Sequence, residues 1–213
     1  FFTESYIDEA ALQAAQEPLS FRLSLLKNHP KHARVLQLAA DKSGWKATPF
    51  KAPDGSLRAM GLALHASFGS IVAQVAEVSV EDNAIHVHRV CCAIDCGTVV
   101  NPDTLVAQMQ GGIAHGLSAA LWGQVTFSNG ASSVRNFNNY PLVRMPQMPR
   151  VDVQIVNTPG APLGGAGEAG VPAVAPALAN AYFALTGTRL RKLPLLMPPP
   201  RKLLPPLGPH VRH

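Results

Sequence analysis

The pattern that predicts the centre of the fold lies at residues 57–94, LRAMGLALHASFGSIVAQVAEVSVEDNAIHVHRVCCAI. Its Val, Ile and Ala residues recur with a period near two, which is typical of half-buried or buried strands. We expect strands at residues 57–66, 71–80 and 85–94, with Asp82-Asn83 turning the chain between the last two. The centre of the fold is therefore predicted to be a β-sheet.

Upstream of these strands the sequence favours helices. Apolar residues at helical spacing predict a first helix over residues 4–16. Pro18 and Pro30 suit the first turns of a second and a third helix, the last ending near Gly44. Residues 46–56, with two prolines and Asp54-Gly55, read as a linker. The predicted organisation is a helical segment at 1–45, this linker, an α+β region at 57–196 and a Pro-rich basic tail at 197–213 without a fixed fold.

Downstream, the signals alternate between the two classes. Asn101 as N-cap and Pro102 at the first position predict a helix over residues 101–121. Asn129-Gly130 predicts a hairpin between strands at 124–127 and 132–137. The remaining predicted elements are a strand at 151–156, a helix at 171–185 with Pro172 in its first turn, and a last strand at 190–193. The expected fold class is α+β, a mixed sheet with packed helices and an N-terminal helical segment.

Composition limits the function classes. The chain has 213 residues, 47% hydrophobic and 15% charged, and a formal net charge of +5. Six basic residues follow the last acidic one, Glu168, and the rest carries 12 basic against 13 acidic side chains, so the charge is not a body-wide nucleic-acid face. No apolar run reaches the roughly 20 residues of a membrane span, and no targeting signal opens the chain at Phe1-Phe2. The sequence leaves periplasm and cytoplasm equally open.

The three cysteines, Cys91, Cys92 and Cys96, lack the paired spacing of zinc or iron–sulfur sites. We expect them to be buried structural residues that hold no cluster. His86 and His88 share one face of a strand, but two ligands without a third make a weak metal site, and a solvated face is the simpler interpretation. His115 is interpreted as a core histidine.

A Gly-rich stretch carries the strongest chemical signal. Gly164-Gly165-Ala166-Gly167-Glu168-Ala169-Gly170 places one carboxylate among four glycines, just before the predicted helix at 171–185. Glycine permits close approach of the backbone to a ligand. The positive end of the helix dipole would favour ionised Glu168, as a general base requires. The alternative is a Gly-rich turn with a solvated glutamate.

A second such segment, Gln108-Met109-Gln110-Gly111-Gly112-Ile113-Ala114-His115-Gly116, lies inside the helix predicted at 101–121. Each helical Gly costs about 1 kcal/mol relative to Ala, so this cluster indicates close packing or approach to a ligand. The amide of Gln108 can both donate and accept hydrogen bonds to such a ligand. A Gly-rich helix contact with a solvated Gln108 explains the pattern equally well.

Together these segments resemble the molybdopterin-binding large subunits of the xanthine dehydrogenase and aldehyde oxidase family, above all the isoquinoline 1-oxidoreductase beta subunits and related aldehyde dehydrogenases. The residues that carry the resemblance, over roughly 2–193, are Glu4-Ser5-Tyr6-Ile7-Asp8-Glu9, Pro18-Leu19-Ser20-Phe21-Arg22, Ala93-Ile94-Asp95-Cys96-Gly97 with Asn101-Pro102, the 108–116 segment, and Gly167-Glu168-Ala169-Gly170 continuing to Pro176-Ala177-Leu178-Ala179-Asn180-Ala181.

The resemblance implies a function. Glu168 falls on the family's active-site base, and Gln108 on a glutamine that contacts the molybdopterin, with Gly111, Gly112 and Gly167 beside the cofactor. The implied reaction oxidises an aldehyde or an N-heterocycle with water-derived oxygen. The implied cofactor is molybdenum–molybdopterin in its cytosine dinucleotide form. The implied partners are a small 2Fe–2S iron–sulfur subunit, a cytochrome c as electron acceptor and a small-molecule substrate, with no nucleic acid.

Members of this family are several-fold longer than 213 residues. The resemblance therefore implies that the chain is the C-terminal portion of a molybdenum hydroxylase large subunit, incomplete and inactive when alone. The alternative from another class is a non-catalytic binding or assembly module that retains the fold.

Overall fold

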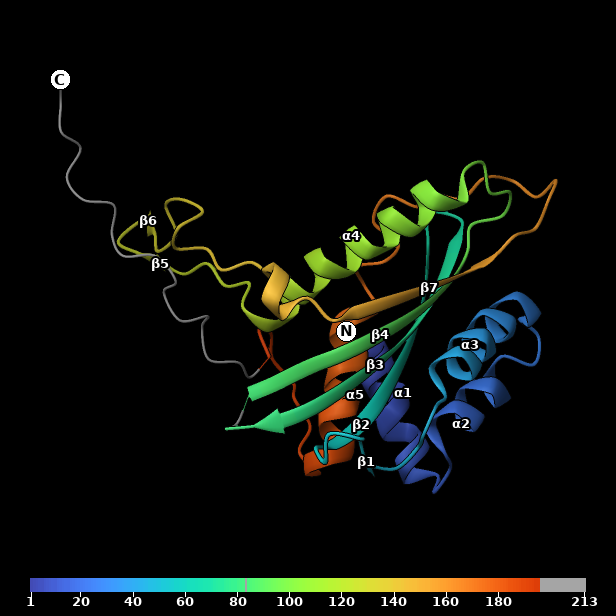
Figure 1. The fold of residues 1–213 in the computed structure, drawn as a ribbon, viewed down its shortest axis with the longest axis horizontal. Helices are drawn as coiled ribbons and strands as arrows, with labels where there is room; N and C mark the ends of the chain where they lie inside the picture. Colours follow the sequence, from blue (N-terminus) through green and yellow to red (C-terminus); the bar gives the residue numbers. More distant parts are fainter. Residues whose placement is uncertain (83, 196–213) are drawn as a thin grey trace.

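The computed structural model describes residues 1–82 and 84–195, and within them five helices pack on one mixed sheet (Figure 1). The predicted tail at 197–213 and Asn83 of the predicted turn lie outside the described residues. The helices are α1 (Phe2–Gln13), α2 (Pro18–Leu25), α3 (Pro30–Ser43), α4 (Pro102–Leu121) and α5 (Val174–Thr186), with a 3-10 turn at Met145–Gln147. The α+β class is confirmed.

The main sheet has the order β1-β2-β3-β4-β7. Its strands are β1 (Phe50–Lys51), β2 (Leu57–Ser67), β3 (Ser70–Glu81), β4 (Ala84–Asp95) and β7 (Arg150–Val156). Neighbours pair antiparallel except β4 and β7, which are parallel. The long crossover that a parallel pair requires contains α4 and a small hairpin, β5 (Phe127–Ser128) with β6 (Ala131–Ser132). In Figure 1 this hairpin projects away from the sheet.

Strand alternation sends apolar side chains to both faces of the sheet. Val72, Cys92 and Ile94 lie in one core with residues of α4 and α5. Cys91 and Ala93 lie in a second core with residues of α3. The sheet is thus a central layer between α4 and α5 on one face and α3 on the other, which is why its strands read as nearly continuous apolar runs.

The adjacent cysteines follow the same alternation. Cys91 and Cys92 enter opposite cores, and neither side chain is exposed. Burial raises the pKa of Cys92 to about 12 and raises that of Cys91 as well. Two thiols on opposite faces of one strand cannot reach a common metal ion. In the described part of the chain no group of three His, Cys, Asp or Glu residues is arranged to hold a metal.

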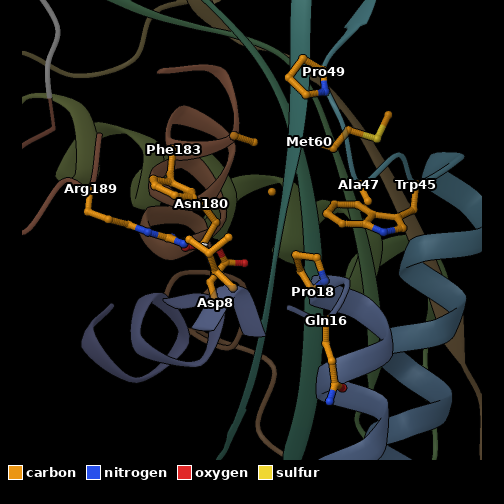
Figure 2. A pocket seen from close by; sticks show the side chains of 13 residues that line it. Asp8, Gln16, Pro18, Trp45, Ala47, Pro49, Met60, Asn180, Phe183 and Arg189 are labelled. Carbon is orange, nitrogen blue, oxygen red and sulfur yellow. Dashed lines mark hydrogen bonds and ion pairs between the residues drawn. The ribbon is translucent and has the colours of Figure 1, made fainter. Parts of the chain in front are cut away.

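A buried polar network fixes the N-terminal helices. Arg22 on α2, only 2% exposed, donates to Glu4 Oε2 at 3.0 Å and to Asp8 Oδ1 at 3.4 Å on α1. Arg189, which follows α5, donates to Asp8 Oδ2 at 2.8 Å and stacks on the Phe183 ring. Figure 2 shows Arg189 extending past Phe183 to Asp8, beside a cavity of about 170 Å³. The network ties both ends of the described chain together.

Several predicted boundaries shift. Residues 46–56, expected to be a linker, contain β1, which pairs with β2. The hairpin turn at Asn129-Gly130 is confirmed, with φ of 50° and 76°, but its strands are two residues each rather than the 124–127 and 132–137 predicted. The last strand at 190–193 is wrong: Arg191 there pairs with Glu9 of α1 at 2.8 Å, so side chains rather than a strand ladder hold the segment.

The helix predicted at 171–185 begins later, at Val174. Residues 171–173 instead form turns in which Val171 donates to the Glu168 carbonyl and Val174 to the Val171 carbonyl. Pro176, not Pro172, occupies the first helical turn, where its missing N–H costs nothing. Gly187 ends the helix in a left-handed conformation, as predicted. None of the helices in the described ranges is long and apolar enough to cross a membrane.

Candidate functional site

The loop at residues 157–173, between β7 and α5, carries Glu168 and is anchored along its length. Its first half is held by the turn after β4: the Thr158 amide donates to the Gly97 carbonyl at 3.1 Å, and the Thr98 hydroxyl to the Ala161 carbonyl at 2.8 Å. The Gly97 amide in turn donates to Asp95 Oδ1 at 2.9 Å, which confirms a tight turn at Asp95–Gly97.

The glycines at 164 and 165 serve close packing. The Gly164 amide donates to the Cys96 carbonyl at 2.9 Å, and the Gly165 amide donates to the Phe68 carbonyl at 2.7 Å. The Ser70 hydroxyl returns a bond to the Gly165 carbonyl at 2.8 Å. A Cβ on Gly165 would lie 2.9 Å from Phe68 Cβ, closer than real side chains come. The loop therefore joins backbone to backbone with the tip of the β2–β3 hairpin.

The loop's other end rests on β3 and α4. Gln74, fully buried on β3, donates from Nε2 to the Gly170 carbonyl at 2.7 Å. Gly112 of α4 faces Gly170, and a Cβ on it would lie 3.5 Å from Gly170 Cα. Gly116, one turn further, would place a Cβ only 2.8 Å from Val174 Cγ2. Glycines in α4 thus bring the helix close to the loop and to the start of α5.

The two Gly-rich segments meet directly. Gln108 on α4 donates from Nε2 to the Gly167 carbonyl at 2.7 Å, across 59 residues of sequence. A Cβ built on Gly167 or on Gly111 would have no atom of the described residues within 4 Å. Gln108 and Gly111, one helical turn apart, are both exposed, whereas Gly112 is buried in the contact with the loop.

Glu168 is exposed and lies six residues before α5 begins. Its expected position at the helix N-terminus is therefore wrong, because the residues between it and Val174 form turns and the influence of the helix dipole fades within the first turn. The glycines at 164–170 are also not left-handed, since each of them has a negative or extended φ. Gly164, Gly165 and Gly170 act through their small size, since a Cβ on each would meet neighbouring atoms within 4 Å.

Glu168 lines a cavity of about 440 Å³ together with six residues from three segments. These are His65, Ser67 and Phe68 of the β2–β3 hairpin, His115 of α4, and Val171 and Pro172 of the loop. His115 is exposed on the same helix face as Gln108 and Gly111, so its interpretation as a core histidine is wrong. Its spacing of seven residues from Gln108 was the signal for this shared face.

His65 and Phe68 gave no sequence signal, because a histidine and a phenylalanine are unremarkable near the end of a strand. Burial lowers the pKa of His65, which favours its neutral imidazole. His86 and His88 lie elsewhere: they sit near the start of β4, where the His88 ring bonds the Ser79 hydroxyl at 2.8 Å, while the Glu168 loop contacts the chain beyond the end of that strand.

Comparison with known proteins identifies the family of the chain. The model of the molybdopterin cofactor-binding domain family matches residues 6–149, and the chain belongs to this family. The matched range contains Gln108 and ends before Glu168.

Among curated proteins, the chain is 39% identical to isoquinoline 1-oxidoreductase subunit beta of Brevundimonas diminuta, over 92% of this chain and 25% of that protein. It is 31% identical to the membrane-bound aldehyde dehydrogenase (pyrroloquinoline-quinone) of Gluconacetobacter polyoxogenes, over 90% of this chain and 27% of that protein. The chain thus spans about a quarter of the length of these relatives.

Among solved structures, quinoline 2-oxidoreductase from Pseudomonas putida 86 superposes with a TM-score of 0.53 at 22% identity, over 59% of this chain and 17% of that one. At this identity the likeness establishes the fold alone.

Proposed function

We propose that this chain supplies the catalytic base and part of the cofactor contact of a molybdenum hydroxylase large subunit, which oxidises an aldehyde or an N-heterocycle. The observation that carries the proposal is the bond from Gln108 to the Gly167 carbonyl. It brings the Gln108 amide against the residue before Glu168, and a Cβ on Gly111 or Gly167 would have no described atom within 4 Å. When bound there, the molybdenum–molybdopterin group supplies the two-electron redox chemistry.

The residues present fit such a group. Gly111 and Gly167 leave room for a ligand, because a side chain at either position would occupy that space. The Nε2 end of the Gln108 amide is held by the loop, so Gln108 can contact a ligand with little further loss of conformational freedom. Gly112 supports this cradle by letting α4 approach Gly170. Glu168, exposed to the cavity, accepts the proton released from water during hydroxylation of an electron-poor carbon.

The finer assignments follow from the same proposal. We propose that the whole protein binds the cytosine dinucleotide form of the cofactor. Its proposed partners are a 2Fe–2S subunit and a cytochrome c electron acceptor. Among the described residues, seven line this cavity, with Glu168 as one of them. Because the relatives are about four times longer, we propose that the chain alone neither retains the cofactor nor turns over substrate.

The test is Glu168→Gln in the cofactor-loaded protein that contains this chain. The amide keeps the volume but cannot accept the proton, so turnover should fall by about 100-fold or more while the molybdenum content stays at the parent level. Glu81→Gln, an exposed glutamate at the far end of β3, is the matched control and should change neither. Turnover within threefold of the parent at equal metal loading would rule Glu168 out as the base.

A further inference from the structure

The Glu168 cavity has an aromatic wall that the proposed base and cofactor contacts do not explain. Phe68 lies at the tip of the β2–β3 hairpin and is 64% exposed, so packing within the described residues does not account for a large apolar side chain there. Val171 and Pro172 extend the apolar lining. The imidazoles of His65 and His115 add hydrogen-bonding groups to the same cavity.

The backbone at Phe68 is unusual. Its φ is 54°, in the left-handed region that Gly, Asn and Asp normally occupy at hairpin tips, and Gly69 follows with φ of 77°. A bulky residue is disfavoured in this conformation, and outliers of this kind cluster at ligand-binding and catalytic sites. The tip therefore carries an aromatic ring where the turn alone would favour a small or polar residue.

The backbone that carries the ring is also tied to the Glu168 loop. The Phe68 carbonyl accepts from the Gly165 amide at 2.7 Å, and Ser70 bonds the Gly165 carbonyl at 2.8 Å. Glu168 follows Gly165 by three residues, and the Gly167 carbonyl between them is held by Gln108 at 2.7 Å. The backbone segments that carry Phe68 and Glu168 thus belong to one hydrogen-bonded unit.

We propose that Phe68 is a specificity-determining residue that stacks on a planar N-heteroaromatic substrate beside Glu168, with His65 and His115 facing the polar atoms of its ring. The inference rests on the proposed function, because it takes this cavity as the substrate cavity. Stacking requires a second π-system, so a heteroaromatic ring gains from Phe68 what a small aliphatic aldehyde does not. A ring nitrogen also gives an imidazole N–H an acceptor.

The test separates binding from chemistry. The dissociation constant of isoquinoline is measured in the cofactor-loaded protein made inactive by Glu168→Gln, with and without Phe68→Ala, Phe68→Leu or Phe68→Tyr. Each replacement keeps a Cβ, so the left-handed strain at the tip is unchanged. Phe127→Ala, which removes an exposed ring on β5 that does not line the cavity, is the matched control. In the parent protein, kcat/KM for isoquinoline and for acetaldehyde is measured alongside.

The Ala and Leu variants should bind isoquinoline about threefold to tenfold more weakly, whereas Tyr and the Phe127→Ala control stay within twofold. In the parent protein, kcat/KM for acetaldehyde should change less than twofold with each of these substitutions. The proposal is overturned if Phe68→Ala or Phe68→Leu binds isoquinoline as tightly as the protein that keeps Phe68. It is also overturned if the parent shows no measurable isoquinoline binding. If instead Glu168→Gln retains turnover, the proposed base fails while the binding result still decides the role of Phe68.

Discussion

Replacing Gly111 by Ala tests whether this glycine faces the proposed cofactor. Gly111 lies within α4, is exposed, and has nothing within 4 Å of the position where a Cβ would stand. With no contact to disturb, the change should act on the cofactor-free protein through helix propensity alone and raise its free energy of unfolding by about 1 kcal/mol. If the open space receives the cofactor, the same methyl group should lower molybdenum occupancy.

Gly116→Ala is the reference with the opposite sign. Its Cβ would lie 2.8 Å from Val174 Cγ2 and 3.1 Å from the Val171 carbonyl oxygen, so α5 or the turn before it must shift by several tenths of an ångström. Overpacking of this kind costs about 1–3 kcal/mol, which offsets or exceeds the gain in helix propensity. Gly116→Ala should therefore be less stable than Gly111→Ala.

Urea unfolding of the cofactor-free protein and metal analysis of the loaded protein measure the two effects. The refuting result for the cradle is a Gly111→Ala protein that is about 1 kcal/mol more stable and binds as much molybdenum as the parent. A destabilised Gly111→Ala protein would instead refute the open geometry at this position.

Three further outcomes are expected. Cys91 and Cys92 should resist a thiol reagent at pH 8 in the native protein and react fully after unfolding, because burial raises both pKa values, that of Cys92 to about 12; rapid native reaction would contradict their burial. Stability, measured by urea midpoints, should decrease as the pH falls below about 6.5, since the neutral form of His65 is favoured in the fold and its folded pKa lies below the unfolded one; His65→Gln should reduce this slope, and an unchanged slope would count against it. Arg22→Met should destabilise the protein by about 1.5–3 kcal/mol, because Glu4 loses its ion pair with Arg22 while Asp8 keeps its bond from Arg189; a loss below about 0.5 kcal/mol would show that Arg22 is dispensable.

Local signals in the sequence were sufficient for most elements. The start of α4 is confirmed because the N-cap is a local device: Asn101 Oδ1 accepts from the Thr104 amide at 3.0 Å. The Asn129-Gly130 turn is confirmed for the same reason, since left-handed conformations are intrinsic to those residue types. Strand alternation likewise predicted β2, β3 and β4 to within one residue at every end.

Errors arose where two local solutions compete or where a distant contact decides. Pro172 and Pro176 both suit a first helical turn, and the choice falls to Pro176 because residues 171–173 turn against Gly116 of α4. Residues 190–193 have the composition of a strand, but Arg191 is drawn to Glu9 of α1, 182 residues away. No local pattern contains that partner.

The candidate site shows the same division. Composition singled out the two Gly-rich segments that carry Glu168 and Gln108, because glycines are costly unless they serve contact or binding, and the family resemblance suggested their roles. The partners that position them come from elsewhere: Phe68 and Ser70 hold Gly165, and buried Gln74 holds Gly170. These bonds span about 95 residues or more of sequence, and each uses a backbone group of the loop as one partner.

This anchoring also explains why the loop has so many glycines and yet little freedom. A glycine-rich segment loses more conformational entropy on ordering than any other, so an unanchored loop would meet a ligand in many conformations. Here the hairpin tip, β3 and α4 each bond a different peptide group of residues 164–170, on both sides of Glu168. The glycines permit the close approach that these bonds require, and the bonds in turn fix the backbone on both sides of Glu168. The backbone that carries Glu168 is thereby ordered by the fold before any ligand binds, which suits the general-base role proposed for this residue.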